Sequence, residues 1–183
     1  QEVEPPPPSL LSDPGFETIA GNEPNADTAP WFTVNENQNG SFVTGTDFAY
    51  EGAQSAKFTF FFDQGSIVQN LTNQIDSALD YTASIWMRKG DASTNANHVN
   101  DPSLSIDLYA SPTLGSGYIY AGTFTSGCLN STSNIWERFE GTLTGGLLAG
   151  REGEYIQIRF VKENDNTRSR IWIDNALLST QAH

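Results

Sequence analysis

Cysteine is almost absent from this sequence. Its 183 residues include one, Cys128, so no disulfide can form within the chain. No apolar run approaches the ~18 residues that a membrane-spanning helix needs, which argues against membrane insertion. No stretch of about ten residues repeats apolar side chains at helical spacing either, so a predominantly helical fold is not expected.

Positive charge is also scarce. Lys and Arg number 9 against 22 Asp and Glu, which gives a formal net charge of −13. Such a surface repels phosphate backbones and anionic lipids, so we expect neither nucleic acid nor membrane partners. A strongly anionic ligand is disfavoured too, unless the few arginines gather at one site.

Residues that usually carry catalysis are few, and they lack partners nearby in sequence. His98 lies in a polar segment and His183 is the last residue, so neither has an orienting partner nearby in sequence. Cys128 stands in "SGCLN" with no neighbouring histidine, which favours an unreactive thiol. No phosphate-binding glycine motif occurs. The sequence therefore favours a binding protein over an enzyme.

Short β-type runs, in contrast, are plentiful. Alternating, aromatic or β-branched residues recur between clusters of Gly, Asn, Asp, Ser and Pro. About ten strands with almost no helix predict an all-β jelly-roll sandwich of two antiparallel sheets. The candidate strands are 31–35, 41–45, 55–62, 66–72, 81–89, 104–111, 117–124, 136–144, 155–163 and 170–178.

The first nine residues, "QEVEPPPPS", differ from the rest. Four consecutive prolines favour a stiff, extended spacer, so we interpret 1–9 as a linker or mature N-terminus and 10–183 as one domain. This composition is compatible with an exported, extracellular protein attached to another module. A cytosolic protein could equally contain a single cysteine, so export is a hypothesis.

Alternation assigns faces to two of the strands. In 81–89 the core side is predicted to be Tyr81, Ala83, Ile85 and Met87, which leaves Trp86 and Arg88 on the other face. In 104–111 the same rule leaves Asp107 and Tyr109 outside. Large aromatic residues on an outer face often mark a binding surface. The polar segment 90–102 is expected to be a long loop between these strands.

The order of several motifs resembles a known group of proteins. "SDPGFE" (12–17), Trp31, "YEGAQSAKF" (50–58), "LDYTASIWMRKG" (79–90), "WERFEGTLT" (136–144) and "IWIDNALL" (171–178) follow one another. This series resembles the carbohydrate-binding modules of families four, nine and twenty-two, jelly rolls of the galactose-binding-domain-like type. The resemblance covers about residues 10 to 180 and leaves the proline-rich segment outside.

The resemblance implies a structural calcium ion where the first and last strands meet. Glu17 and Asp174 would supply carboxylates, and backbone carbonyls near Asp13, Gly52 and Lys57 would complete an oxygen shell of the kind Ca²⁺ prefers. The alternative is that Asp174 and its neighbour Asn175 only cap a strand and that Glu17 is solvated.

The resemblance also implies a sugar site on the concave sheet. Aromatic rings would stack on the C–H faces of pyranoses, and planar polar side chains would bond their hydroxyl groups. The expected ligand is a neutral β-glucan or xylan, held in a groove without catalysis. The candidate residues are Trp86, Arg88, Asp107, Tyr109, Tyr118, Tyr120 and Gln69.

Other interpretations remain open. Tyr118 and Tyr120 could fill the core instead, and Trp31 and Trp136 are expected to pack rather than bind. A jelly-roll polysaccharide lyase or glycoside hydrolase is an alternative, although the chain lacks the Glu-x-Asp-x-x-Glu strand of one such glycosidase family. A structural or adhesin domain is the third possibility.

Overall fold

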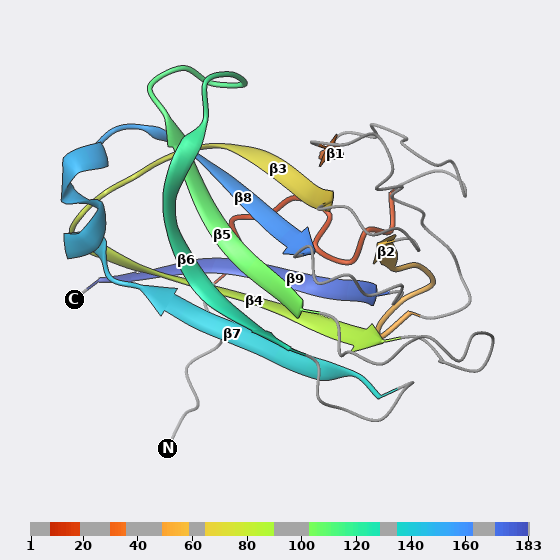
Figure 1. Ribbon diagram of the computed structural model, residues 1–183. Coiled ribbons are helices and arrows are strands. Elements are labelled where there is room, and N and C mark those ends of the chain that lie inside the picture. The colour runs from red at the N-terminus through yellow and green to blue at the C-terminus, as the bar shows by residue number, and fades with distance from the viewer. Residues whose placement is uncertain are drawn as a thin grey trace.

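Two antiparallel β-sheets pack face to face in the computed structural model of this chain (Figure 1). The structure describes residues 8–18, 30–35, 49–58, 65–89, 103–128, 135–162 and 171–182. One sheet has five strands in the spatial order β1-β3-β8-β5-β6, and the other has four in the order β2-β9-β4-β7. The predicted jelly-roll sandwich is confirmed.

The strands follow the predicted segments closely. Nine of the ten predicted strands overlap an observed one, and the tenth, 41–45, lies outside the described residues. The short 3-10 helix η2 (Gly145–Arg151), which follows β7, was not predicted. The strands are β1 (Trp31–Asn35), β2 (Ala56–Phe58), β3 (Gly65–Gln74), β4 (Leu79–Lys89), β5 (Ser103–Ser111), β6 (Ile119–Cys128), β7 (Glu137–Leu143), β8 (Tyr155–Lys162) and β9 (Ile171–Ala182). Among the described residues, no helix is long and apolar enough to cross a bilayer.

The core lies between the two sheets and is filled by alternate residues of the strands. The predicted inner residues of β4 are all buried, with Tyr81 at 1% exposure and its three partners at 0%. Trp31 is fully buried between Phe16 and Phe160, whose ring centroids lie 4.8 and 5.8 Å from its own. The expectation that Trp31 packs in the interior is therefore confirmed.

β6 closes one side of the sandwich. It pairs with β5 in the five-stranded sheet and then crosses toward β7 of the other sheet (Figure 1). The crossing depends on Gly141 of β7, because a Cβ there would lie 1.9 Å from the carbonyl oxygen of Phe124. The backbones of the two strands thus meet so closely that only glycine fits at this position.

The segment 8–18 ties the two sheets together. Leu10 donates its backbone N–H to the Leu178 carbonyl at 2.7 Å, and Ala176 donates to the Pro14 carbonyl at 2.9 Å, so the segment follows β9. On the other side, the amide of Gln69 in β3 makes two 2.8 Å hydrogen bonds to the backbone N–H and carbonyl of Ser12. The start of the described chain is thereby fixed to both sheets.

Candidate functional site

The predicted sugar-binding residues do not form one site. Trp86 and Arg88 lie on β4 in the four-stranded sheet, whereas Asp107 and Tyr109 lie on β5 in the five-stranded sheet. Each pair does point away from the core, as alternation predicted. The prediction that they share one face is wrong, because alternation distinguishes inner from outer positions but cannot tell the two outer faces of a sandwich apart.

The outer face of the five-stranded sheet carries a row of planar side chains. Strand register places Asn70 of β3 opposite Gln157 of β8, Gln157 opposite Tyr109 of β5, and Tyr109 opposite Tyr120 of β6. The side-chain amide of Gln157 donates an N–H to the side-chain Oδ1 of Asn70 at 2.7 Å. The rings of Tyr109 and Tyr120 meet edge to face, with centroids 5.8 Å apart. Four adjacent strands therefore contribute to one continuous row, which we call the tyrosine row.

A second row of side chains supports the first. Register places Arg159 of β8 opposite Asp107, and Asp107 opposite Thr123 of β6. The guanidinium of Arg159 lies over the ring of Tyr109, 3.7 Å from its centroid, and its Nε–H donates to the Gln157 side chain. This cation–π contact fixes Tyr109 from one side.

Asp107 is the buried acid of this face. Only 8% of it is exposed, and its two oxygens accept hydrogen bonds from the hydroxyls of Thr123, at 2.7 Å, and Ser105, at 3.1 Å. The Thr123 hydroxyl also lies 3.0 Å from the Tyr120 hydroxyl. Asp107 thus anchors the network that positions Tyr120, and its own oxygens are already used by neighbours.

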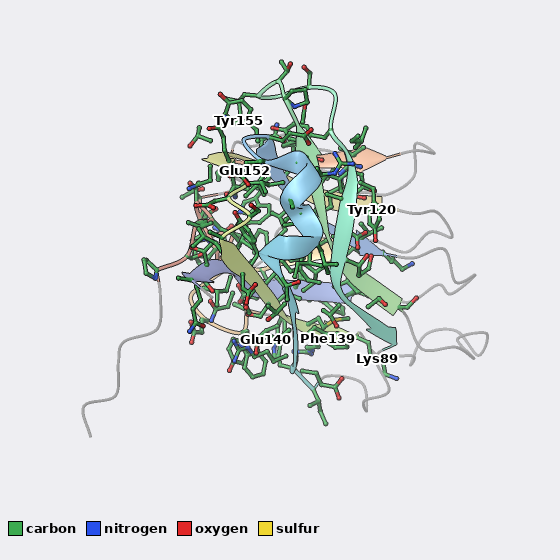
Figure 2. The ribbon with its side chains drawn as sticks, turned by 90° about the vertical axis from the view of Figure 1, so that its left-hand side faces the viewer. Lys89, Tyr120, Phe139, Glu140, Glu152 and Tyr155 are labelled. Atoms are coloured by element: carbon green, nitrogen blue, oxygen red, sulfur yellow. The ribbon has the colours of Figure 1, made fainter. Side chains whose placement is uncertain are left out.

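Tyr120 is the open ring of the row. It is 54% exposed, so the alternative in which it fills the core is wrong. Figure 2 shows it on β6, well apart from Glu140 of the four-stranded sheet. Tyr118 lies just before β6, and its hydroxyl accepts the Gly115 backbone N–H at 3.2 Å, within the β5–β6 turn. Tyr118 therefore supports the turn rather than the row.

Gln69 does not face a ligand. Its side chain is only 2% exposed and points to the core side of β3, where it bonds the backbone of Ser12. Its prediction as a sugar-binding residue is wrong for a physical reason. Within β3 the inner positions include Ile67 and Leu71, and Gln69 shares their parity.

Sequence reasoning missed four polar residues of this face. The signal for two of them was present in β8, where Gln157 and Arg159 alternate with buried Ile156, Ile158 and Phe160. The same rule that located Trp86 would have placed them on an outer face. Asn70 carried the same signal, because it alternates with the inner Gln69 and Leu71 of β3, whereas bulges interrupt the pairing of β6 on both sides of Thr123.

A second cluster, the carboxylate corner, brings Glu17 and Asp174 together from opposite ends of the chain. A Cβ on Gly15 would lie 3.8 Å from Glu17 Oε1 and 3.9 Å from Asp174 Oδ1, so both oxygens border one point. Asp174 lies where β9 bulges: the pairing with β4 shifts at this point, and Asn175 adopts φ 48°. Asp174 alternates with the buried Ile171 and Ile173 and so points to the outer side of β9, and Asn175 is the bulged residue that follows it.

The two carboxylates hold the segment 49–54 by its backbone. Asp174 Oδ2 accepts the N–H groups of Tyr50, at 2.7 Å, and Glu51, at 3.1 Å. Glu17 Oε1 accepts those of Ala53, at 2.9 Å, and Gln54, at 3.2 Å. Gly52 is required between them, because it has φ +70° and a Cβ there would lie 2.0 Å from Glu17 Oε1.

Burial makes the charge on Asp174 costly. The residue is fully buried, and this desolvation raises its pKa to about 6, with the neighbouring charge of Glu17 adding to the rise. Three backbone N–H groups, including that of Asn175 at 2.7 Å, oppose the shift. A buried carboxylate beside a second carboxylate is an environment that a cation would stabilise.

The remaining predicted calcium ligands, Asp13, Gly52 and Lys57, differ in how they lie relative to the corner. Both carboxylate oxygens of Asp13 accept local donors, from the Glu17 N–H and from Thr18, and its carbonyl accepts the Trp31 indole N–H at 2.8 Å. Gly52 borders the corner directly, and Lys57 follows in β2, which pairs with β9. The side-chain Oε1 of Gln54, in the segment that the corner holds, is buried without a hydrogen-bond partner, and sequence reasoning did not point to it. Among the described residues, no group of three or more acidic, His or Cys side chains forms a metal site, so any ion here would need backbone and amide oxygens.

Comparisons with known proteins add the fold but no family. No protein-family model matches this sequence, and no curated protein is similar enough to count as a match. Among solved structures, the Stig cyclase Fisc from Fischerella sp. TAU, in complex with an indole derivative, has a TM-score of 0.68, with 16% identity over 95% of this chain and 97% of its own. The CBM22-1 xylan-binding domain of Xyn10C from Paenibacillus barcinonensis has a TM-score of 0.61, with 14% identity over 97% of both chains. The arabinose-bound MgGH51 α-L-arabinofuranosidase has a TM-score of 0.65, with 14% identity over 94% of this chain and 26% of that enzyme.

These similarities confirm the resemblance to the jelly rolls of carbohydrate-binding modules. Cyclases and part of a glycosidase share the same fold, however, at identities just as low. The fold is thus common to domains that bind sugars and to enzymes. Function therefore depends on the side chains that this chain presents on the shared fold.

Proposed function

We propose that this protein is a non-catalytic glycan-binding module whose ligand lies along the tyrosine row of the five-stranded sheet. The observation that carries the proposal is the exposed ring of Tyr120 next to Tyr109, flanked by Arg159, Gln157 and Asn70 on adjacent strands. A ring offers its face to the apolar C–H surface of a pyranose, and amide and guanidinium groups offer donors and acceptors to its hydroxyls.

The ligand class follows from the charge of the molecule. A net charge of −13 disfavours a uronate-rich polymer, so a neutral β-glucan or xylan fits best. The xylan-binding domains with the same fold support this choice. Affinity should be modest, with Kd of about 10 μM to 1 mM, because ring stacking adds little while desolvation of polar groups opposes it. Attachment to another module, in an exported protein, would raise the local concentration of ligand enough to make such affinity useful.

The acidic residues of this face do not favour hydrolysis. Glycoside hydrolysis by the usual route needs two carboxyl groups about 5 to 10 Å apart across the cleft. Of the strands that the structure describes, only β5 places an acid on the outer face of the five-stranded sheet, and this acid, Asp107, is engaged by Thr123 and Ser105. A solitary, hydrogen-bonded carboxylate is better suited to positioning its neighbours.

Calcium belongs to the same proposal as a structural ion. Glu17 and Asp174 would provide carboxylate oxygens, Gln54 its amide oxygen, and the backbone near Gly52 and Lys57 carbonyl oxygens. Asp13 is left out of this set, because its carboxylate oxygens bind Glu17 and Thr18 within its own turn and its carbonyl binds the Trp31 indole, whereas oxygens of Glu17 and Asp174 border one point. The ion would neutralise two adjacent carboxylates and so fix the segment 49–54 against β9.

Replacement of the open ring tests the site. Tyr120→Ala should weaken binding to soluble xylan or β-glucan about tenfold in affinity electrophoresis, because the stacking surface is removed. The matched control is Leu114→Ala, which changes a similarly exposed apolar residue (47%) in the β5–β6 turn; this variant should bind normally. Circular dichroism should stay native in both variants. Unchanged binding by Tyr120→Ala would remove the tyrosine row from the site.

A further inference from the structure

Three aromatic rings gather on the outer face of the other sheet. Tyr50 stacks on Trp86 of β4 with ring centroids 4.2 Å apart and an interplanar angle of 14°, and Trp136, just before β7, meets Tyr50 edge-on at 5.7 Å. Tyr50 remains 36% exposed, and both tryptophans are half-buried, so Trp136 packs against Tyr50, as expected, without being enclosed. We call these three residues the aromatic cluster; it lies across the core from the tyrosine row.

An ion pair and a hydroxyl group lie beside the aromatic cluster. Register places Arg138 of β7 opposite Trp86, and Arg138 forms an ion pair with Glu140 and a 3.4 Å hydrogen bond to the Ser84 hydroxyl. Arg138 and Glu140 are 47% and 45% exposed, so their remaining donors and acceptors face solvent. Figure 2 shows Glu140 at the edge of this sheet, remote from Tyr120.

We propose that the aromatic cluster is a second glycan-binding face, independent of the tyrosine row. The ligand class rests on the proposed function, and the local chemistry supports a neutral sugar. Half-exposed rings fit the C–H face of a pyranose, and an ion pair that cancels its own charge complements uncharged hydroxyl groups rather than an anion. A hydrophobic peptide is a poorer fit, because the neighbouring outward residues of β4 and β7, Thr82 and Thr142, bond each other and offer no apolar pocket.

The carboxylate corner positions the exposed ring of this face. Asp174 accepts the backbone N–H of Tyr50 at 2.7 Å, and register places Asp174 opposite Trp86. The backbone that carries Tyr50 is therefore anchored directly beside the ring on which Tyr50 stacks. Glu17 holds the following residues of the same segment, which makes Asp174 and Glu17 positioning residues for this face.

The two faces point in opposite directions because the core separates the sheets. One molecule would therefore hold two glycan chains, one on each side, and could bridge them. A bridging module differs from a single-site module in a measurable way: it binds two oligosaccharides at once and crosslinks long chains.

Isothermal titration with xylohexaose and cellohexaose distinguishes the two faces. The wild type should bind about two oligosaccharides per chain, and both Tyr120→Ala and the double variant Tyr50→Ala/Trp86→Ala should retain about one. Combining all three substitutions should abolish binding. Tyr50→Phe, which keeps the ring, should retain both sites, and Leu147→Ala, at an exposed position of η2, serves as a control.

Each result separates this inference from the proposed function. One site that is lost in Tyr120→Ala and unaffected by Tyr50→Ala/Trp86→Ala would overturn the second face and leave the first. One site that depends only on Tyr50 and Trp86 would overturn the tyrosine row and leave the second face. No binding by the wild type would overturn both. Glu17→Gln should weaken only the site that depends on Tyr50; equal weakening of both sites would show a general structural effect and remove Glu17 as a positioning residue.

Discussion

Asp174 shows at the scale of one residue how burial and function conflict. Its side chain is fully buried and accepts three backbone N–H groups, yet desolvation still raises its pKa to about 6. An acid that is harder to ionise in the folded state than in the unfolded state destabilises the fold once it is charged. In return for this unfavourable free energy, the carboxylate holds the backbone of Tyr50 in place.

This shift predicts a pH dependence of stability in the presence of chelator. Because the pKa of Asp174 is raised on folding, the folded state holds more protons between pH 4 and 6, so the contribution of Asp174 to stability falls as the pH rises through that window. The change amounts to at most about 3 kcal/mol. Asp174→Asn should lack this component, measured as the difference between urea midpoints of variant and wild type at pH 4 and pH 7. A difference that is independent of pH would show that folding does not raise the pKa of Asp174.

At the residue scale, the tyrosine row depends on neighbours more than on single side chains. The ring of Tyr109 is covered on one side by Arg159, at 3.7 Å, whereas Tyr120 is held through Thr123 and Asp107. Tyr109 is thus fixed from β8, whereas Tyr120 is fixed by Thr123 of its own strand, which Asp107 of β5 holds in turn. Such preorganisation reduces the entropy lost when a ligand binds.

At the scale of elements, β6 determines the shape of the sandwich. It belongs to the five-stranded sheet, but its backbone touches β7 of the other sheet at Gly141. Gly122 and Gly127 of β6 also pack closely, against Leu143 and Phe139 of β7. The edge of the sandwich is therefore closed by contacts between backbones and small residues.

Gly141→Ala should test this closure. The added Cβ would meet the Phe124 carbonyl oxygen at 1.9 Å, so β6 or β7 must move, and we expect a loss of about 2 kcal/mol or more in chemical unfolding. Gly146→Ala is the matched control, because a Cβ at Gly146 has no atom within 4 Å and should leave stability nearly unchanged. Equal stability of the two variants would show that β6 and β7 do not meet as closely as described.

At the scale of the whole molecule, the two ends of the described chain meet. Segment 8–18 follows β9 and also bonds β3 through Gln69, and the carboxylate corner joins this segment to residues 49–54. A cation at the corner would therefore stabilise contacts among three distant parts of the sequence. Such an ion stabilises the folded state alone, because the unfolded chain does not bring these oxygens together.

Removal of metal should lower the melting temperature. At calcium concentrations about 100-fold above Kd, binding contributes about 2.7 kcal/mol, which corresponds to roughly 5 to 10 °C for a domain of this size. Differential scanning calorimetry with and without excess EDTA measures the shift, and Glu17→Gln should reduce it. An identical melting temperature in calcium and in EDTA would contradict the proposed ion.

The sequence by itself determined the local features of this protein. Alternation located nine strands and separated inner from outer side chains in β4 and β5, because the period of a strand is a property of neighbouring residues. Composition determined the acidic surface and the lack of a disulfide. The resemblance of the two ends of the chain to those of known modules also predicted that Glu17 and Asp174 lie together.

Only the tertiary structure decided which outward side chains share a face. It separated Trp86 and Arg88 from Tyr109 and Asp107, turned Gln69 inward against Ser12, and joined Arg159 to the tyrosine row. The order of strands in a sheet depends on pairings between distant segments and on how β6 crosses the edge. The alternating pattern within a single strand does not contain that information, so the same pattern occurs in β4 and β5 although their outer faces point in opposite directions.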